Sequence, residues 1–359
     1  MSRQTYHPGY SHRKPKKRGR TSRWILLLLL IIGGGLYYAY TLLYASNVYV
    51  LNEQTSSIRI PTGSTFDDVK KTLYSGGYII HRNNFELVAR LKKYEGIVKP
   101  GQYNLQNGMS NLDLVNKLRS GDQDPVKVVF HNVRYPDQLA GRIAQQIEAD
   151  SLTLISLMQN SQYLDSLGVT PASIFTIMIP NTYEVYWNTT ARDFLERMKK
   201  ESNRFWNDNR TAKMKELGMD AHQVITLASI VEKETNMNDE KARVAGVYLN
   251  RLNKGWLLEA DPTLVFAHGN FNIRRVLNIY KEIDSPYNTY KYTGLPPGPI
   301  CLPSVSSIDA VLDHEEHSYM FFCAREDFSG YHNFAVTLEQ HNVNAWKYQQ
   351  ALNKRKIMN

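Results

Sequence analysis

A glutamate stands at the end of an apolar stripe in residues 224–235. This segment has no glycine or proline, and its apolar residues recur three and four positions apart, as on one face of an α-helix. Glu234 follows Ile230 by four positions and Val231 by three, so its carboxyl group takes the next place on that apolar face. Burial disfavours the carboxylate form and raises the pKa, as a general acid working near neutral pH requires.

A second glutamate, Glu232, lies two residues earlier and on a different helical face, behind Ile225 and Ser229. Because that face is not part of the stripe, we expect Glu232 to be solvated. A structural interpretation of Glu234 is also open, since many helices end in glutamates that simply mark where the helix leaves the core. The pattern alone does not decide between an acid and a helix end.

The stretch Ala-Ser-Ile-Val-Glu-Lys-Glu-Thr at 228–235 resembles the endolytic murein transglycosylase family, the YceG-like proteins. Its Glu-Thr pair is also similar to the Glu-Ser signature of lysozyme-like lytic transglycosylases, whose glutamate is the catalytic acid and base. The resemblance covers roughly residues 58–350. Further matching segments occur in the same order, namely Ala-Asp-Pro-Thr (260–263), Tyr-Asn-Thr-Tyr (287–290), Gly-Leu-Pro-Pro-Gly-Pro-Ile (294–300) and a late His-x-Phe (332–334).

The resemblance implies a lytic transglycosylase that cleaves the β-1,4 bond between N-acetylmuramic acid and N-acetylglucosamine in nascent peptidoglycan. Such an enzyme forms a 1,6-anhydro end and acts as a terminase of glycan polymerisation. Glu234 would be its catalytic residue. The implied substrate-binding residues are Asp261, Asn288, Tyr290 and His332. No cofactor or metal is implied; glycan strands, the membrane and peptidoglycan polymerases are the expected partners.

Two segments depart from the family pattern. Asn181 replaces the acid of a Pro-Asp-Thr-Tyr motif, which puts an acid/base role there in doubt but leaves a polar contact. Cys-Leu-Pro-Ser at 301–304 stands where Asn-Pro-Gly is common. Two other functions stay open: a non-catalytic cell-wall anchor that binds glycan, and a hydrolase with Asp261 or Glu259 as second carboxylate and water as acceptor.

Metal and thiol chemistry have weaker signals. His314 and His317 flank two glutamates, but a zincin helix has its histidines four positions apart and a third ligand. We therefore interpret residues 314–317 as a solvated charged turn. Cys301 and Cys323 are the two cysteines, and the sequence leaves open whether they form a disulfide.

Charge is concentrated at the N-terminus. Residues 1–23 hold eight of the 43 basic residues and no acid, which leaves 35 basic against 34 acidic residues in the rest. A nucleic-acid binder would carry its basic surface on the folded part, so this distribution argues against one. Residues 24–45 contain no charged residue in 22 positions, enough to span a bilayer. The basic flank predicts a cytoplasmic N-terminus with the remainder outside, and the bulky aromatic end argues against signal cleavage. The family resemblance implies that this membrane is the bacterial inner membrane.

The elements after this anchor predict an α+β protein. A strand at 56–60, a helix at 64–76 capped by Ser64, a helix at 83–94 and a strand at 102–105 follow an order similar to a LysM module, which the family resemblance also implies. A mostly helical, lysozyme-like catalytic domain with an added β/loop region is expected later. The predicted divisions are a basic tail (1–23), an anchor (24–45), a LysM-like domain (46–125), a linking α/β region (126–210) and a catalytic domain (211–359).

Overall fold

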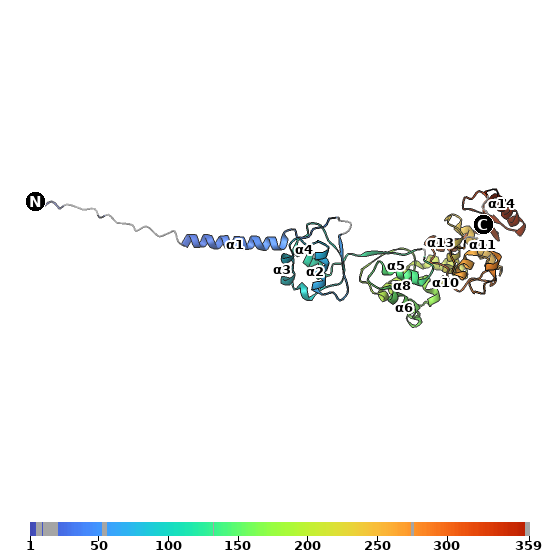
Figure 1. Ribbon diagram of the computed structural model, residues 1–359, viewed down its shortest axis with the longest axis horizontal. Helices are drawn as coiled ribbons and strands as arrows, with labels where there is room; N and C mark the ends of the chain where they lie inside the picture. Colours follow the sequence, from blue (N-terminus) through green and yellow to red (C-terminus); the bar gives the residue numbers. More distant parts are fainter. Residues whose placement is uncertain (5–8, 10–20, 52–55, 132, 274–275, 356–359) are drawn as a thin grey trace. The chain divides into compact units, whose positions relative to one another are not determined.

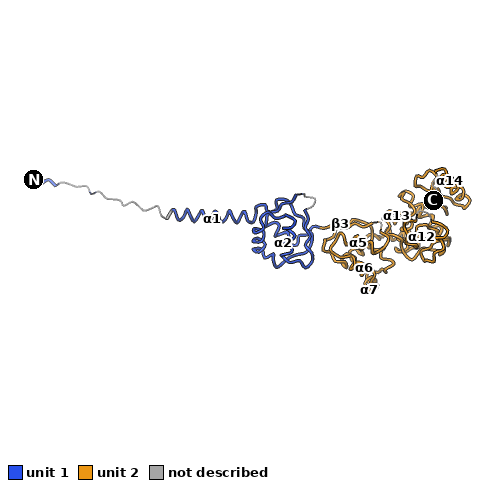
Figure 2. Tube along the Cα trace, in the orientation of Figure 1, with its two compact units in different colours: residues 1–124 blue, residues 125–359 orange. Residues whose placement is uncertain are grey.

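The computed structural model describes residues 1–4, 9, 21–51, 56–131, 133–273 and 276–355. In this part of the chain helices combine with two-stranded antiparallel sheets, which confirms a mixed α and β fold. The chain divides into two compact units, residues 1–124 and residues 125–359 (Figure 2). The basic tail predicted at 1–23 lies mostly outside the described residues.

Helix α1 (Thr21–Tyr44) opens the first unit (Figure 1). Its segment Arg23–Tyr44 has 22 residues and is apolar and long enough to cross a membrane. The helix ends against the folded part of its unit, where Leu42 is buried and its carbonyl oxygen accepts a hydrogen bond of 2.9 Å from the Asn111 side chain. The coarse prediction of one apolar N-terminal helix is therefore confirmed.

Among its described residues, the first unit also contains one antiparallel pair of strands and three shorter helices. Strand β1 (Ser57–Ile60) pairs antiparallel with β2 (Gly101–Asn104). The helices are α2 (Phe66–Ser75), α3 (Arg82–Leu91) and α4 (Asn111–Ser120), and a short 3-10 turn, η2 (Tyr94–Gly96), follows α3.

The start of α2 differs by one residue from the prediction. Thr65, not Ser64, caps the helix, and its side chain forms a reciprocal capping box with Asp68.

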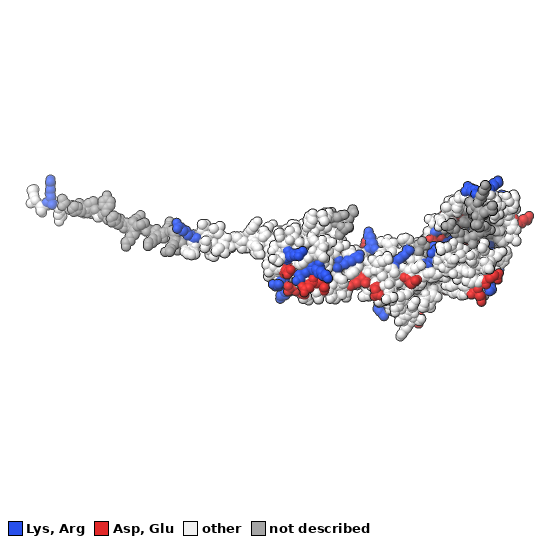
Figure 3. All heavy atoms as spheres, viewed as in Figure 1, with Lys and Arg blue, Asp and Glu red and all other residues white. Residues whose placement is uncertain are grey.

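On the face shown in Figure 3, basic and acidic side chains are interspersed over both units.

The second unit begins with strand β3 (Val126–Val129), which pairs antiparallel with β4 (Thr182–Val185). Between and after them lie α5 (Pro136–Ala144), α6 (Ser151–Gln159), α7 (Ser161–Ser166), η3 (Pro171–Ile177), α8 (Ala191–Phe205) and α9 (Asp208–Glu216). Helix α5 is shorter than the stretch 136–149 that its apolar pattern covers.

The second half of this unit is built around α10 (Ala221–Glu234), which contacts α11 (Lys241–Asn253), α12 (Asp261–His268) and α13 (Val305–Leu312). The remaining elements are η4 (Asn278–Glu282), strands β5 (Phe321–Ala324) and β6 (His332–Ala335), which form an antiparallel pair, and α14 (Leu338–Lys354). Helix α10 begins at a capping box between Asp220 and Gln223.

Burial around α10 exceeds what its stripe predicts. Residues 224–231 are all buried, so the helix is enclosed on every side before its last turn. One apolar cluster joins these residues to residues 126–198 and to α13. The division predicted at residue 210 stays a prediction.

Candidate active site

Glu234 is the last residue of α10, at the point where the helix leaves the core. Thr235 follows in extended conformation and ends the helix. The hydroxyl group of Tyr248, on α11, donates a hydrogen bond to Glu234 Oε1. Tyr248 is only 1% exposed, whereas Glu234 retains part of its surface. The two helices therefore hold the carboxyl group between a buried donor and solvent.

The surroundings of Glu234 favour its protonated form. The pKa of Glu234 is raised to about 7, mainly by burial and also by the negative charge of Asp261. The hydrogen bond from Tyr248 and the positive charge of Arg251 lower this pKa, but by less. A carboxyl group with a pKa near 7 can both give and take a proton at neutral pH. The raised pKa of Glu234 agrees with the effect predicted from its place on the apolar stripe.

Two hollows meet at Glu234 and Asp261, which line both of them. Their volumes are about 270 and 290 Å³. The first, called here the arginine hollow, is lined by Arg134, Lys233, Glu234, Asp261, Pro262, Val265, Phe266, Phe271, Ile273, Val276 and Ile300. The second, called the aromatic hollow, is lined by Glu234, Tyr248, Arg251, Leu258, Glu259, Asp261, Tyr290, Phe321, Phe322, Leu338 and His341. An extended ligand that occupied both hollows, together called the groove below, would pass over Glu234.

Asp261 and Tyr290 lie at this site and contact each other. Tyr290 donates a hydrogen bond of 2.6 Å to Asp261 Oδ1. Burial raises the pKa of Tyr290, and the hydrogen bond to Asp261 raises it further. Glu259 adopts a left-handed backbone with φ of 52°, uncommon for a residue other than glycine. Its amide donates to Thr289 O at 3.0 Å, so the strained turn joins the start of α12 to the loop bearing Tyr290.

Asn288 is fully buried, and its side chain is occupied within its own loop. Its amide group donates to Lys281 O and Ile283 O, both at 2.8 Å, and its Oδ1 accepts from the Tyr290 amide at 3.0 Å. Asn288 does not line either hollow. The geometry gives it a role in shaping the loop that carries Tyr290.

His332 also lies outside the two hollows. Its Nδ1 is 3.0 Å from Oε2 of Glu240, and its amide donates to Oε1 of the same carboxylate at 2.9 Å. Its ring meets Phe322 edge to face, and Phe322 meets Tyr248 in the same way. Glu240 is 2% exposed. His332 thus supports the wall of the aromatic hollow behind Phe322 and Tyr248.

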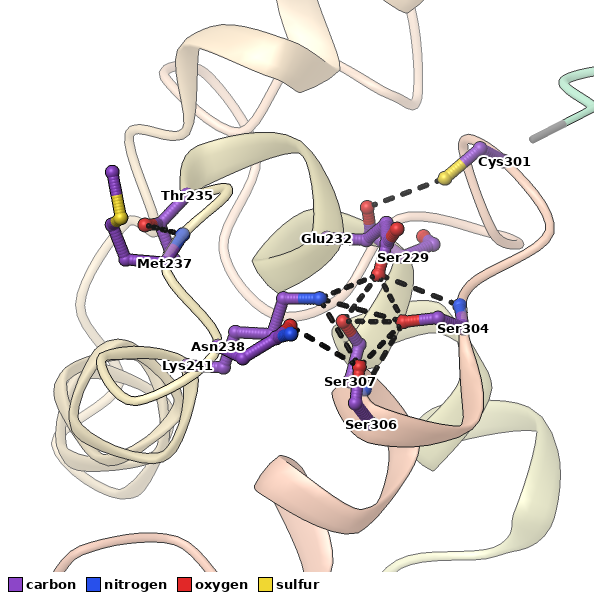
Figure 4. Close-up of polar contacts among 10 residues, drawn as sticks. All are labelled: Ser229, Glu232, Thr235, Met237, Asn238, Lys241, Cys301, Ser304, Ser306 and Ser307. Atoms are coloured by element: carbon purple, nitrogen blue, oxygen red, sulfur yellow. Dashed lines mark hydrogen bonds and ion pairs between the residues drawn. The ribbon is translucent and has the colours of Figure 1, made fainter. Parts of the chain in front are cut away.

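The prediction that Glu232 is solvated is wrong. Figure 4 shows its carboxylate among Lys241, Ser304 and Ser307. Lys241, which is 4% exposed, lies 3.0 Å from Glu232 Oε2, and the same oxygen accepts from both serine hydroxyls. Burial raises the pKa of Glu232, but the bonds from Ser304, Ser307 and Lys241 together outweigh it, so the pKa lies below its usual value. Segment 304–307, distant in sequence, covers the face that the helical pattern left open.

The same helix is joined to the proline-rich segment at Ser229. The Ser229 hydroxyl donates to Thr226 O at 2.7 Å and accepts from the Ile300 amide at 3.0 Å. The Cys301 thiol lies 3.6 Å from Ser229 O. Residues 300–304 therefore follow the buried side of α10, and Ile300 continues into the arginine hollow.

The segment 314–317 is only partly solvated: Glu316 is exposed, and the other three residues are half-buried. Glu315 pairs with Arg243 at 2.9 Å, and His317 Nε2 is 2.9 Å from Arg243 O. Within the described ranges no group of three or more His, Cys, Asp and Glu side chains is arranged to hold a metal ion. Cys301 and Cys323 are both free thiols. Asn181 is exposed, and its Oδ1 accepts from the next amide, away from both hollows.

Sequence reasoning missed several residues of the groove. Tyr248 was not among the site residues predicted from the sequence, although a buried tyrosine hydroxyl needs a hydrogen-bond partner. Arg134 and His341 come from segments 100 residues or more away from Glu234 in sequence and carry no local motif. Only the tertiary fold brings them to the groove.

The chain is similar to proteins named endolytic murein transglycosylase. The protein of that name from Bacillus subtilis (strain 168) is 29% identical over 320 residues, covering 85% of this chain and 88% of the relative. The one from Streptococcus pneumoniae serotype 2 (strain D39) is 28% identical over 319 residues, covering 80% of this chain and 57% of the relative. A crystal structure of a putative YceG-like protein from Listeria monocytogenes matches with a TM-score of 0.54 and 28% identity, covering 80% of this chain and 97% of that one.

The family model called "YceG-like family" matches residues 58–347, which include part of the first unit, most of the second and every residue assigned above to the two hollows. The match confirms the resemblance found in the motifs around Glu234, and the chain belongs to the YceG-like family.

Proposed function

We propose that this protein is a peptidoglycan lytic transglycosylase and that Glu234 is its catalytic acid and base. The observation that carries the proposal is the position of Glu234, with a pKa of about 7, where two hollows meet. A polysaccharide cleaved within its length has to occupy sites on both sides of the acid, and the paired hollows offer them. The names of the relatives, which specify murein, support the substrate class.

In this mechanism the protonated Glu234 gives its proton to the glycosidic oxygen that links N-acetylmuramic acid to N-acetylglucosamine. Because Oε1 accepts the Tyr248 hydrogen bond, the transferable proton resides on Oε2. The C1–O bond breaks and leaves an oxocarbenium-like muramyl unit. The carboxylate then takes the proton of the muramyl 6-hydroxyl while O6 bonds to C1. The 1,6-anhydro ring closes without water, and Glu234 regains its proton.

Asp261 keeps a hydrolase as the second candidate. Its carboxylate borders both hollows beside Glu234, and its charge acts on the Glu234 pKa. In a two-carboxylate hydrolase Asp261 would activate water or form a glycosyl intermediate, and the product would carry a reducing end. In the transglycosylase, by contrast, Asp261 and its partner Tyr290 contact the sugar, and the charge of Asp261 helps to keep the Glu234 pKa high.

The remaining proposals concern placement. The apolar helix α1 anchors the protein as a single-pass protein of the bacterial inner membrane, with residues 1–23 in the cytoplasm and the units outside, beside strands leaving membrane-bound polymerases. Cleavage there would end strand growth, the role of a terminase. Residues 46–125 serve as a LysM-like glycan-binding domain, and residues 211–359 as a lysozyme-like catalytic domain.

Product analysis tests the proposal. Uncross-linked glycan strands are digested with the purified wild-type protein and with E234Q, and the new ends are identified by mass spectrometry. We expect anhydromuramyl ends from the wild type and a rate about 10³-fold lower from E234Q. Reducing ends would favour the hydrolase. Glycan binding with no new ends from the wild type would favour the non-catalytic anchor, and unchanged anhydro ends from E234Q would exclude this acid.

A further inference from the structure

The two hollows beside Glu234 differ in how their arginines are used. In the aromatic hollow, Arg251 is bonded by the protein: it donates to Met320 O and Leu258 O, both at 2.8 Å, and pairs with Glu259 at 3.2 Å. Its charge is therefore neutralised before any ligand binds. A neutral, hydrogen-bonding sugar suits this hollow.

In the arginine hollow, Arg134 is held differently. Its guanidinium group lies over the ring of Phe271, 4.0 Å from the centroid, and its backbone amide donates to Gln138 at 3.0 Å. Within the described ranges no carboxylate forms an ion pair with Arg134. An aromatic ring fixes the plane of a guanidinium without using its N–H donors, so the bidentate face stays available to an anion.

The other ionisable residues of this hollow are Lys233, Glu234 and Asp261. Lys233 adds a second positive charge, Glu234 is uncharged in its acid form, and the Asp261 carboxylate accepts a hydrogen bond from the Tyr290 hydroxyl. With two cations against one carboxylate, the hollow favours an anion. The rest of the lining is apolar and includes Val265 and Phe266. An anion with a small apolar neighbour matches this combination.

Peptidoglycan offers such a group on every second sugar. Each N-acetylmuramic unit bears a lactyl substituent, and its carboxyl group is either free or extended by a peptide that carries carboxylates of its own, whereas N-acetylglucosamine bears none. We propose that Arg134 binds a carboxylate on the muramyl substituent of the sugar beside the scissile bond and thereby selects which of the two alternating linkages lies over Glu234. This inference rests on the proposed peptidoglycan substrate.

Binding to the full-length protein in detergent tests this role. The E234Q background prevents turnover, and dissociation constants are measured for four glycans of equal length. These are peptide-bearing strands, strands stripped of peptide by an amidase, stripped strands whose carboxyl groups are converted to methylamides, and chitin oligosaccharides. We expect R134A to weaken binding of charged strands about 10- to 100-fold and to leave binding of the two neutral glycans unchanged.

The arms also locate the carboxylate. A loss with the stripped strands alone assigns it to the free lactyl group, and a loss with the peptide-bearing strands alone assigns it to the peptide. A loss with both charged strands shows that Arg134 binds whichever carboxylate the muramyl substituent carries. R192A is the matched control, because Arg192 lies over Tyr163 at 4.4 Å but lines neither hollow, and it should change nothing. R134K, which keeps the charge without the planar fork, should retain part of the affinity.

An equal loss for all four glycans, or no loss for any, would overturn the assignment of Arg134. Thermal melting of each variant separates a folding defect from a binding defect. Failure of the proposed function has a different signature, since a wild-type protein that makes no new glycan ends would reject catalysis while a charge-selective effect of R134A could still be measured.

Discussion

Two glutamates two residues apart on α10 have opposite environments. Glu232 faces Lys241, Ser304 and Ser307, so Oε2 of its carboxylate accepts a hydrogen bond from each of them and its pKa is lowered. Glu234 faces the groove with Tyr248 as its hydrogen-bond partner, and burial raises its pKa to about 7. Burial acts on both; the number of donors decides the sign of the pKa shift. One carboxylate is thereby fixed as an anion, and the other can exchange a proton.

The sharpest test of this contrast is the pair of glutamine variants. E234Q removes the proton donor but keeps the shape, so we expect cleavage to fall about 10³-fold with little change in folding stability. E232Q should leave substantial activity in the molecules that remain folded. Initial rates on glycan strands, scaled by the folded fraction from circular dichroism, measure both. A larger rate loss in E232Q than in E234Q would reverse the assignment.

Glu232 should instead dominate stability. E232Q leaves the buried ammonium group of Lys241 without its anion, and we expect a loss of about 2–4 kcal/mol in the free energy of unfolding. The double variant E232Q/K241M removes both charges and should recover part of this loss. Denaturant titration at neutral pH measures the wild type, E232Q and the double variant. A double variant no more stable than E232Q would contradict the ion-pair explanation.

The neighbours of Glu234 should move its pH profile in opposite directions. Loss of the Tyr248 hydrogen bond in Y248F raises the Glu234 pKa, so the alkaline limb of the rate moves to higher pH. Loss of the Asp261 charge in D261N lowers the pKa, and the limb moves to lower pH. We expect rates at the optimum within about tenfold of wild type for Y248F. Profiles of kcat/KM from pH 5 to 9 are the measurement, and shifts in the same direction would refute this electrostatic account.

The smallest expected effect concerns stability against pH. Because the folded pKa of Glu234 is raised, its contribution is present below the unfolded value of 4.5 and is lost as pH rises through about 7. Glu232, whose pKa is lowered, contributes above its unfolded value and loses that contribution as pH falls through its folded pKa. E234Q should therefore lose less stability than wild type between pH 5 and 8. Melting temperatures across this range test the difference.

Local sequence pattern predicted the helix, the apolar stripe and the position of Glu234 on it. These features depend on residues within four positions of one another. The environment of Glu232 depends on residues 304–307, about 70 positions later, and no periodicity within α10 contains them. The same holds for Arg134 in the groove and for the bonds that direct Asn288 into its own loop. Local pattern thus predicted where the proposed acid lies on the helix, and tertiary contacts determined its neighbours.

The bond between the Ser229 hydroxyl and the Ile300 amide has a consequence for product escape. Together with the hydrogen bond between Glu232 and Ser304 one turn later, this bond holds α10 against residues 300–304, and Ile300 lines the groove. That side cannot swing open without breaking buried hydrogen bonds. We therefore expect a severed strand to depart lengthwise, or past Leu338 and His341 of α14 on the opposite side.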